Sequence, residues 1–318
     1  MDVQGIHHIT AIASNPQANL DFYAGFLGLR LVKQTVNFDA PDVYHLYYGD
    51  AEGTPGTILT FFPFPDATRG KRGAGEILAV AFSVPGDSLG FWMERLSRGG
   101  IEFTGPTRRF GEELIRFLDP DGMQLELFAD PSVDPLPGWA GSAASPRQAI
   151  RRFHGVTFIH RETAQTAAFL SDVMGFTRED SEGNRLRFIV GPENARARID
   201  VVADPSASPA RQSAGSVHHI AWRAIDDEAQ RVWREELSRA GASPTSVIDR
   251  SYFHSVYFRE PAGVLFEIAT DPPGFTIDEP VEALGTSLML PSWLESERQL
   301  IERHLPPITV PGLLKADV

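Results

Sequence analysis

The sequence contains no cysteine among its 318 residues. Disulfides, thiolate-bound zinc, iron–sulfur clusters and thiol nucleophiles are therefore excluded. Any metal site must take its ligands from His, Asp, Glu or water. Four of the nine histidines form two adjacent pairs, His7-His8 and His218-His219.

Long apolar runs and excess positive charge are also absent. No segment approaches the roughly 20 apolar residues of a membrane helix, and the opening MDVQGIHHIT lacks the basic and apolar regions of a secretory signal. The chain has 29 Lys and Arg against 42 Asp and Glu, a net charge of −13, and an acidic chain repels phosphate. We therefore expect a cytoplasmic protein that binds neither nucleic acid nor a membrane.

The chain repeats itself in quarters. Residues 77–130 align with residues 218–271 at an offset of 141, and residues 5–14 align with residues 152–161 at an offset of 147. These alignments divide the chain into four modules in two related halves, joined by a Pro- and Gly-rich linker. The predicted domain limits are 1–135 (modules 1 and 2), 150–280 (modules 3 and 4) and a C-terminal tail, 281–318.

Each module follows one plan: a short apolar strand, a helix, then two or three antiparallel strands. In module 1 the strand is IHHITAIA (6–13), and the helix after it can be capped by Asn15 and stopped by Gly28. In module 4, SVYFRE (255–260) and VLFEIAT (264–270) form a hairpin. This order predicts an α+β fold of four βαβββ modules, forming two open, curved mixed β-sheet barrels with helices outside.

A divalent metal with open coordination positions is well served by two imidazoles and one carboxylate. The histidine pairs lie on the first strands of modules 1 and 4, and Glu267 lies in an apolar strand where an unpaired carboxylate would be costly. Arg250 is an alternative partner for that carboxylate. Because side chains alternate along a strand, only one histidine of each pair is expected to face a given site, and alternation does not say which.

The other two modules provide an internal comparison. Leu78 stands at the place of His219 and Gly155 at the place of His8, whereas Glu126 keeps the carboxylate. Packing alone would favour apolar residues at all these places. An isolated histidine is more often a packed or surface residue than a ligand, but two pairs on related strands together with Glu267 favour one metal site beside one degenerate site.

The HHIT and VHHIAW strands, the PAGVLFEIATDPPGF segment and the four-module plan resemble the vicinal-oxygen-chelate superfamily of glyoxalases, bleomycin-resistance proteins and extradiol dioxygenases. Within it, the chain is most similar to ring-cleaving dioxygenases of hydroquinones, with which it shares LGLRLVKQTVNFD (27–39) and the tail segment LPSWLESERQLIERHLPP (290–307). The resemblance implies a non-haem iron, extradiol-type dioxygenase that opens a hydroquinone- or catechol-type diol with O2. It implies Fe(II) as the metal, with Mn(II) as a second option.

The resemblance also assigns residues. The metal ligands that it implies are His8, His219 and Glu267. The further active-site residues that it implies are His7, His218, Arg250 and Tyr257. His218 is a candidate acid or base because an imidazole titrates near neutral pH. Arg116 stands where the repeat matches Tyr257, which supports a site-specific role for the tyrosine, whereas Arg250 matches Arg109 and could equally be structural.

This ligand set has a topological consequence. His8 belongs to module 1, while His219 and Glu267 belong to module 4, so modules 1 and 4 must pair around the metal. Modules 2 and 3 are then left to pair with each other. Three aromatic residues could line a ring-binding pocket, although aromatic residues on strands more often belong to the core. These residues are Trp222, Phe253 and Phe266.

Two other functions stay open. A glyoxalase-type isomerase or lyase usually has four metal ligands and needs no O2, but TILTFFPF (57–64), where a fourth ligand could lie, contains no carboxylate or imidazole. A resistance protein that sequesters an aromatic drug would need no metal, and the two histidine pairs with Glu267 argue against it. The sequence does not define the oligomeric state, and a homo-oligomer is one option.

Overall fold

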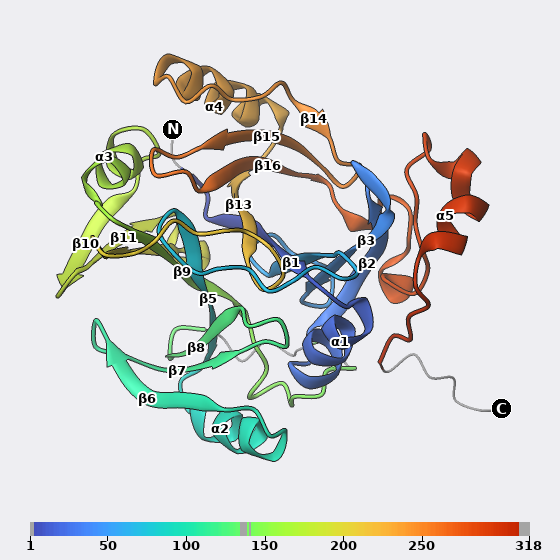
Figure 1. The fold of residues 1–318 in the computed structure, drawn as a ribbon, viewed down its shortest axis with the longest axis horizontal. Helices are drawn as coiled ribbons and strands as arrows, with labels where there is room; N and C mark the ends of the chain where they lie inside the picture. Colours follow the sequence, from blue (N-terminus) through green and yellow to red (C-terminus); the bar gives the residue numbers. More distant parts are fainter. Residues whose placement is uncertain (1–2, 134–138, 140, 312–318) are drawn as a thin grey trace.

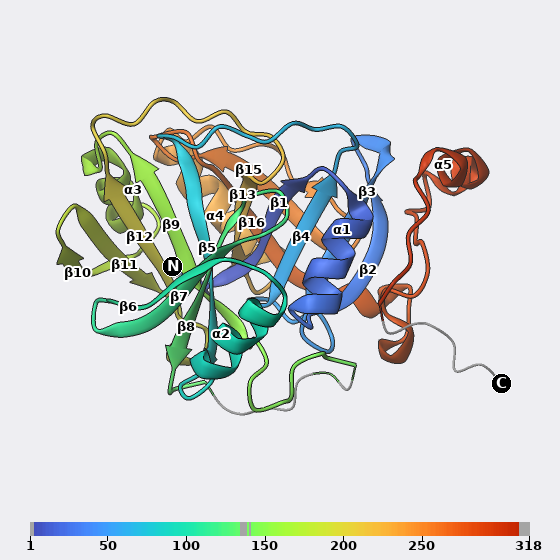
Figure 2. The same cartoon turned by 60° about the horizontal axis from the view of Figure 1, so that its bottom comes forward.

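The computed structural model describes residues 3–133, 139 and 141–311, so the end of the predicted tail, 312–318, and part of the predicted linker lie outside the described residues. The strands form two eight-stranded sheets, each open and curved, with the helices on their outer sides (Figures 1 and 2). The predicted α+β fold is confirmed.

The first sheet joins the two ends of the chain. Its strand order is β14-β15-β16-β13-β1-β4-β3-β2. The bounds of its strands are β1 (Ile6–Ala13), β2 (Arg30–Asn37), β3 (Ala40–Gly49), β4 (Ile58–Pro63), β13 (Val217–Ala224), β14 (Ile248–Asp249), β15 (Phe253–Arg259) and β16 (Leu265–Pro273). At its centre β1 and β13 run antiparallel, and each has a parallel neighbour on its other side, β4 and β16 respectively.

The second sheet has the same plan and is built from the middle of the chain. Its strand order is β10-β11-β12-β9-β5-β8-β7-β6. The bounds of its strands are β5 (Glu76–Pro85), β6 (Phe103–Arg109), β7 (Glu112–Leu118), β8 (Gln124–Asp130), β9 (Arg152–His160), β10 (Thr177–Glu182), β11 (Arg185–Val190) and β12 (Ala197–Ala203). Each sheet therefore takes strands from both halves of the sequence, while the domain limits 1–135 and 150–280 stay a prediction from the repeat.

The helices are short. The α-helices are α1 (Pro16–Leu20), α2 (Leu89–Arg98), α3 (Ala164–Asp172), α4 (Asp227–Arg239) and α5 (Arg298–His304). A π-helix, η1 (Asp21–Phe26), continues α1, and the 3-10 turns are η2 (Glu193–Ala195), η3 (Phe275–Ile277), η4 (Val281–Ala283) and η5 (Glu295–Glu297). Within the described ranges, no helix has the length and apolar character needed to cross a membrane.

The first helical segment begins and ends where the sequence predicts. The Asn15 side chain accepts a hydrogen bond from the backbone N–H of Ala18 at 2.9 Å, which caps the helix. Gly28 closes the segment with a φ of +75°, a conformation that favours glycine. A Cβ at this position would also lie 2.6 Å from Ser142 Oγ, so the turn is closely packed against the chain beyond β8.

A buried lysine fixes the segment after β16 to β2. Lys33 Nζ lies 2.5 Å from carboxylate oxygens of both Asp278 and Glu279, and it donates to the Phe275 carbonyl at 3.1 Å. The Lys33 side chain is fully buried. Further along the tail, the ring of Trp293 packs edge-on against Phe38, with the centroids 5.6 Å apart.

Replacing this lysine should destabilise the protein strongly. Lys33→Met leaves two carboxylates without their counter-charge, and breaking a buried ion pair in this way costs about 3–5 kcal/mol. We expect a large drop in the urea midpoint at an unchanged m-value. The control is Arg98→Met, which removes an ion pair to Glu94 whose side chains are 79% and 62% exposed. Equal midpoint shifts for the two variants would contradict the anchoring role of Lys33.

Candidate metal centre

Three buried side chains from three adjacent strands meet on one face of the first sheet. They are His8 on β1, His219 on β13 and Glu267 on β16. Nε2 of His219 lies 3.2 Å from Nε2 of His8 and 2.9 Å from Oε2 of Glu267, and that oxygen lies 3.4 Å from His8 Nε2. The three residues that the resemblance implies as ligands therefore converge.

The donor set fits a divalent metal. Ligand atoms about 2.1 Å from one ion lie roughly 3 Å apart when the angles between them are near 90°. Oε1 of Glu267 accepts a hydrogen bond from Ser255 at 2.5 Å, but Oε2 is buried without a hydrogen-bond partner. A buried anionic oxygen without a donor is unfavourable, and a cation would compensate it. The three residues could therefore bind a metal ion.

The protonation states suit metal binding as well. Burial raises the pKa of Glu267, but the neighbouring His8 and His219 outweigh burial and hold this pKa well below its usual value. Burial lowers the pKa of His219 despite the attraction of Glu267. A carboxylate and a neutral imidazole are the forms that a metal ion requires of these ligands.

Two irregularities in the β1–β13 ladder bring the first member of each histidine pair to the site. The register skips His7 on β1 and His218 on β13, so each is the extra residue of a β-bulge. Nδ1 of His7 lies 2.9 Å from Nδ1 of His8, and Nδ1 of His218 lies 2.7 Å from Nδ1 of His219. The first members therefore contact the ring nitrogens turned away from Glu267, which regular alternation would not allow.

The first members are neutral at neutral pH. Burial, followed by the adjacent imidazole, lowers the pKa of His7 to about 3, and the same two causes lower the pKa of His218 to about 3. The sequence analysis expected His218 to titrate near neutral pH, and its lowered pKa differs from that expectation. A neutral imidazole can accept the second ring N–H of its neighbour, which fixes the tautomer and orientation of a ligating histidine.

A cavity of about 330 Å³ opens beside the three converging residues, and His8 and His219 form part of its wall. Its aromatic carbocyclic lining consists of Phe38, Tyr47, Phe62, Phe64, Phe253 and Tyr257. Of the predicted pocket aromatics, Phe253 lines the cavity, whereas Trp222 and Phe266 are fully buried core residues whose ring centroids lie 5.5 Å apart. The hypothesis that these two line the pocket is wrong, because their side chains point to the opposite face of their strands.

Tyr257 and Arg250 lie together at the edge of this cavity. Tyr257 is the cross-strand partner of Glu267 in the β15–β16 hairpin, and its ring centroid is 5.6 Å from that of His219. Arg250 Nε donates to the Tyr257 hydroxyl at 3.3 Å, and Nη1 lies 3.2 Å from an Asp39 carboxylate oxygen. Arg250 thus contacts the tyrosine and Asp39, so it is not the hydrogen-bond partner of Glu267 that the sequence left open.

The cavity also contains polar residues that the sequence does not mark as functional. These are Thr10, Asn37, Asp39 and His45. Thr10 carries a detectable signal, since it lies two residues after His8 and so on the same face of the strand. His45 carries none, because it lies on a strand without an expected ligand, and only the order of strands in the sheet brings it to the site.

Sequence and structure comparisons identify the superfamily to which the chain belongs. Residues 5–127 and 152–268 match the profile of the Glyoxalase/Bleomycin resistance protein/Dioxygenase superfamily. The chain belongs to this superfamily. The family resemblance proposed from the sequence is therefore confirmed.

Several members of the superfamily are similar along nearly the whole chain. MhqO, a proposed ring-cleaving dioxygenase of Bacillus subtilis (strain 168), is 44% identical over 309 residues, which cover 96% of this chain and 97% of MhqO. The chlorohydroquinone/hydroquinone 1,2-dioxygenase of Sphingobium indicum is 33% identical over 315 residues, covering 97% and 98%. A crystal structure of a proposed dioxygenase from Bacillus subtilis superposes with a TM-score of 0.93 at 44% identity, covering 97% of this chain and 98% of the other.

In the second sheet, the residues at the positions equivalent to the candidate metal site pack together and leave almost no cavity. Arg109 donates to both carboxylate oxygens of Glu126, at 2.7 and 2.8 Å. His154 stacks on Phe128 with ring centroids 4.0 Å apart, and the cavity at this place has a volume of only about 10 Å³. An arginine thus satisfies the carboxylate that the first sheet leaves without a donor at one oxygen.

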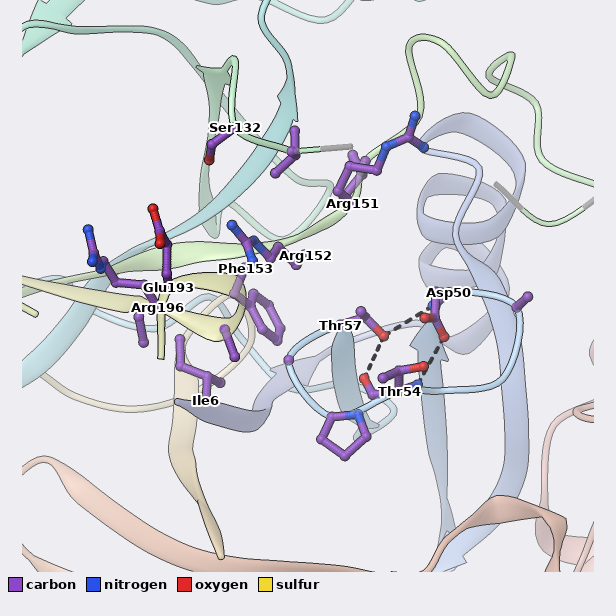
Figure 3. Close-up of a pocket in the computed structure, with 17 residues that line it drawn as sticks. Ile6, Asp50, Thr54, Thr57, Ser132, Arg151, Arg152, Phe153, Glu193 and Arg196 are labelled. Carbon is purple, nitrogen blue, oxygen red and sulfur yellow. Dashed lines mark hydrogen bonds between the residues drawn. The ribbon is translucent and has the colours of Figure 1, made fainter. Parts of the chain in front are cut away.

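A larger cavity of about 710 Å³ lies where β1 and β9 begin (Figure 3). Figure 3 shows that the guanidinium groups of Arg151, Arg152 and Arg196 diverge rather than meet at one point. On the opposite wall, the carboxylate of Asp50 accepts hydrogen bonds from backbone N–H groups of its own loop, including that of Gly53 at 2.8 Å. Size alone does not make this cavity the functional site, since its polar groups do not converge.

Metal content should depend on the carboxylate of the first sheet alone. We expect Glu267→Gln to lower bound iron or manganese per chain at least tenfold, because an amide is a poorer, uncharged ligand. The matched control is Glu126→Gln, which changes the equivalent carboxylate in the second sheet and should leave metal content unchanged. Elemental analysis of protein loaded with Fe(II) or Mn(II) and then desalted measures both, and equal losses would contradict the assignment.

Proposed function

We propose that the chain is an Fe(II)-dependent ring-cleaving dioxygenase that opens a hydroquinone-type aromatic diol with O2. The observation that carries this proposal is the convergence of two imidazoles and one carboxylate on the wall of an aromatic-lined cavity. Three protein donors leave other coordination positions of a divalent ion available to a diol and O2. The names of the full-length relatives, one of them a chlorohydroquinone/hydroquinone 1,2-dioxygenase, support the same reaction class.

The residues fit iron, with manganese as the second option. His8, His219 and Glu267 would hold it, and two imidazoles with one carboxylate form the ligand set of non-haem Fe(II) oxygenases. When bound, the iron would supply Lewis acidity toward the diol and electron transfer between the diol and O2. The role of the chain is to hold the diol, orient it and handle its protons.

Two groups beside the ligands can donate a hydrogen bond to the diol. Burial, followed by the charge of Glu267, raises the pKa of Tyr257, so its phenol stays protonated and can donate to an oxygen of the diol. Arg250, 3.3 Å from the phenol oxygen, would stabilise the charge left behind. His218 lines the cavity and stays our candidate acid: while its Nδ1 accepts the second ring N–H of His219, its neutral imidazole has an Nε2–H group that can donate to an oxygen of the diol. His7 would orient His8.

The cavity favours a substrate with a single ring. Its volume of about 330 Å³ lies at the lower end of the range of roughly 300–1,000 Å³ for small-molecule sites. The rings of Phe62, Phe64 and Phe253 offer it apolar walls. A monocyclic hydroquinone with a small substituent therefore suits the site better than a polycyclic diol.

The decisive experiment is anaerobic reconstitution with Fe(II), followed by O2-uptake assays with methylhydroquinone, chlorohydroquinone and catechol. We expect uptake with the hydroquinones and incorporation of both atoms of labelled O2 into a ring-opened product. No uptake with any diol, by protein shown to hold iron, would refute the proposal. Stoichiometric zinc with turnover that needs no O2 would instead support a glyoxalase-type isomerase.

Removing the phenol of Tyr257 should slow the reaction without releasing the metal. We expect Tyr257→Phe to lower kcat about a hundredfold, the lower range for a general acid or base, with iron content unchanged. Tyr44→Phe is the control, because its hydroxyl bonds to the Pro306 carbonyl at 3.1 Å, away from the cavity. If Tyr257→Phe kept the kcat of this control, Tyr257 would not be the proton donor.

A further inference from the structure

Four polar side chains form a continuous hydrogen-bonded chain beside the cavity, and three of them line it. The Tyr47 hydroxyl lies 2.8 Å from Nδ1 of His45, and both residues belong to β3. Nε2 of His45 lies 2.8 Å from Thr60 Oγ1 on β4, and Thr60 donates to Thr10 Oγ1 on β1 at 2.9 Å. We call these four residues the β3–β1 chain.

The register of the sheet accounts for this arrangement. Tyr47 is the cross-strand partner of Thr60, and Thr60 is in turn the partner of Thr10. Thr10 pairs with His219 across the β1–β13 ladder. One transverse row of the sheet therefore leads from Tyr47 to a proposed metal ligand, and His45, two residues from Tyr47, shares its face of β3.

The hydrogen bonds of the β3–β1 chain follow one direction of donation, from Tyr47 toward Thr10. Burial, followed by the nearby His8 and His219, lowers the pKa of His45 well below its usual value, so its imidazole is neutral. A neutral imidazole donates through one nitrogen and accepts through the other. With the Tyr47 hydroxyl donating to Nδ1, the Nε2–H group donates to Thr60. Since Thr60 gives its own proton to Thr10, the Thr10 hydroxyl proton is left for an acceptor in the cavity that Thr10 lines.

The far end of the chain is held firmly. Tyr47 is almost fully buried, and its ring packs edge-on against Phe275 and Tyr252, with centroid distances of 5.2 and 6.1 Å. His45 lies between this anchored residue and Thr60 in the hydrogen-bonded chain, and its ring centroid is 4.2 Å from that of Phe62. A rotation of Thr60 or Thr10 would break at least one bond of the β3–β1 chain.

We propose that His45 is a positioning residue of the site: it acts through Thr60 to direct the Thr10 hydroxyl toward an oxygen atom of the bound diol. This role rests on the function proposed above. In this role His45 acts on the diol only through Thr60 and Thr10. It contributes by keeping one tautomer and one direction of donation along the β3–β1 chain.

The test compares three variants of the full-length, Fe(II)-loaded protein. His45→Phe keeps an aromatic ring on the cavity wall but removes both hydrogen bonds, and His45→Gln keeps a donor and an acceptor. Tyr48→Phe is the matched control: it removes the hydroxyl of the next buried tyrosine of β3, which donates to Asn19 at 2.8 Å on the other face.

For methylhydroquinone, we expect His45→Phe to lower kcat about tenfold, the effect of one well-placed hydrogen bond. Iron content should not change, His45→Gln should recover most of the loss, and Tyr48→Phe should keep the wild-type kcat. The proposal would be overturned by a wild-type kcat in His45→Phe, by an equal loss in Tyr48→Phe, by a failure of His45→Gln to recover, or by a loss explained by missing iron.

A second measurement separates this proposal from the proposed function. If the iron-loaded wild type consumed no O2, the dioxygenase assignment alone would fail. Calorimetric titration of the same proteins with methylhydroquinone under nitrogen would then test His45. An approximately tenfold weaker Kd for His45→Phe, restored in His45→Gln and absent in Tyr48→Phe, supports the positioning role, and equal affinities for all variants overturn it.

Discussion

The antiparallel pairing of β1 with β13 is the contact on which the rest of the site depends. It joins the first and last quarters of the chain at the centre of one sheet, and it brings His8 beside His219. The parallel pairing of β13 with β16 then places Glu267 next to both. Without the β1–β13 ladder, the three donors would belong to separate parts of the molecule and could not share one ion.

The same ladder shows how two sheets of one plan can differ at equivalent positions. Both sheets have a central antiparallel pair with two register irregularities, so the backbone framework is common to them. They differ in how the equivalent arginine is used. Arg109 neutralises Glu126 directly, whereas Arg250 turns to Tyr257 and Asp39 and leaves Glu267 to the histidines. The difference between the two sheets at these positions therefore lies in side-chain partners rather than in topology.

The positions of the carboxylate and of the histidine pairs could be predicted from the sequence, because the repeat allows equivalent positions of the modules to be compared. The matched positions of Glu126 and Glu267 located the carboxylate, and the histidine pairs on related strands marked the central pair of strands. Arg250 shows where such reasoning stops: the two matched arginines are the same residue type, and only three-dimensional neighbours tell them apart. The bulges at His7 and His218 escape prediction for a related reason, because a bulge is a property of two strands in register and not of either strand alone.

The β3–β1 chain marks the same limit, since only Thr10 among its members belongs to a motif that the sequence analysis singled out, the HHIT strand. Tyr47, Thr60 and Thr10 become neighbours only through the register of three strands. The polar residues that the row takes from β3 and β4 are indistinguishable, in sequence, from the alternating surface of any half-buried strand.

The order of the strands along the sequence has a consequence for biosynthesis, because the strands of the second sheet lie between the two groups of strands that form the first sheet. All strands of the second sheet lie between Glu76 and Ala203, whereas the first sheet needs strands from both sides of this interval. As the chain emerges from its N-terminus onward, the inner sheet can form while β1 to β4 still lack their partners. The apolar faces of those early strands must wait for β13 to β16, so the sheet that carries the candidate metal site is the last to be completed and the most dependent on the chain being finished.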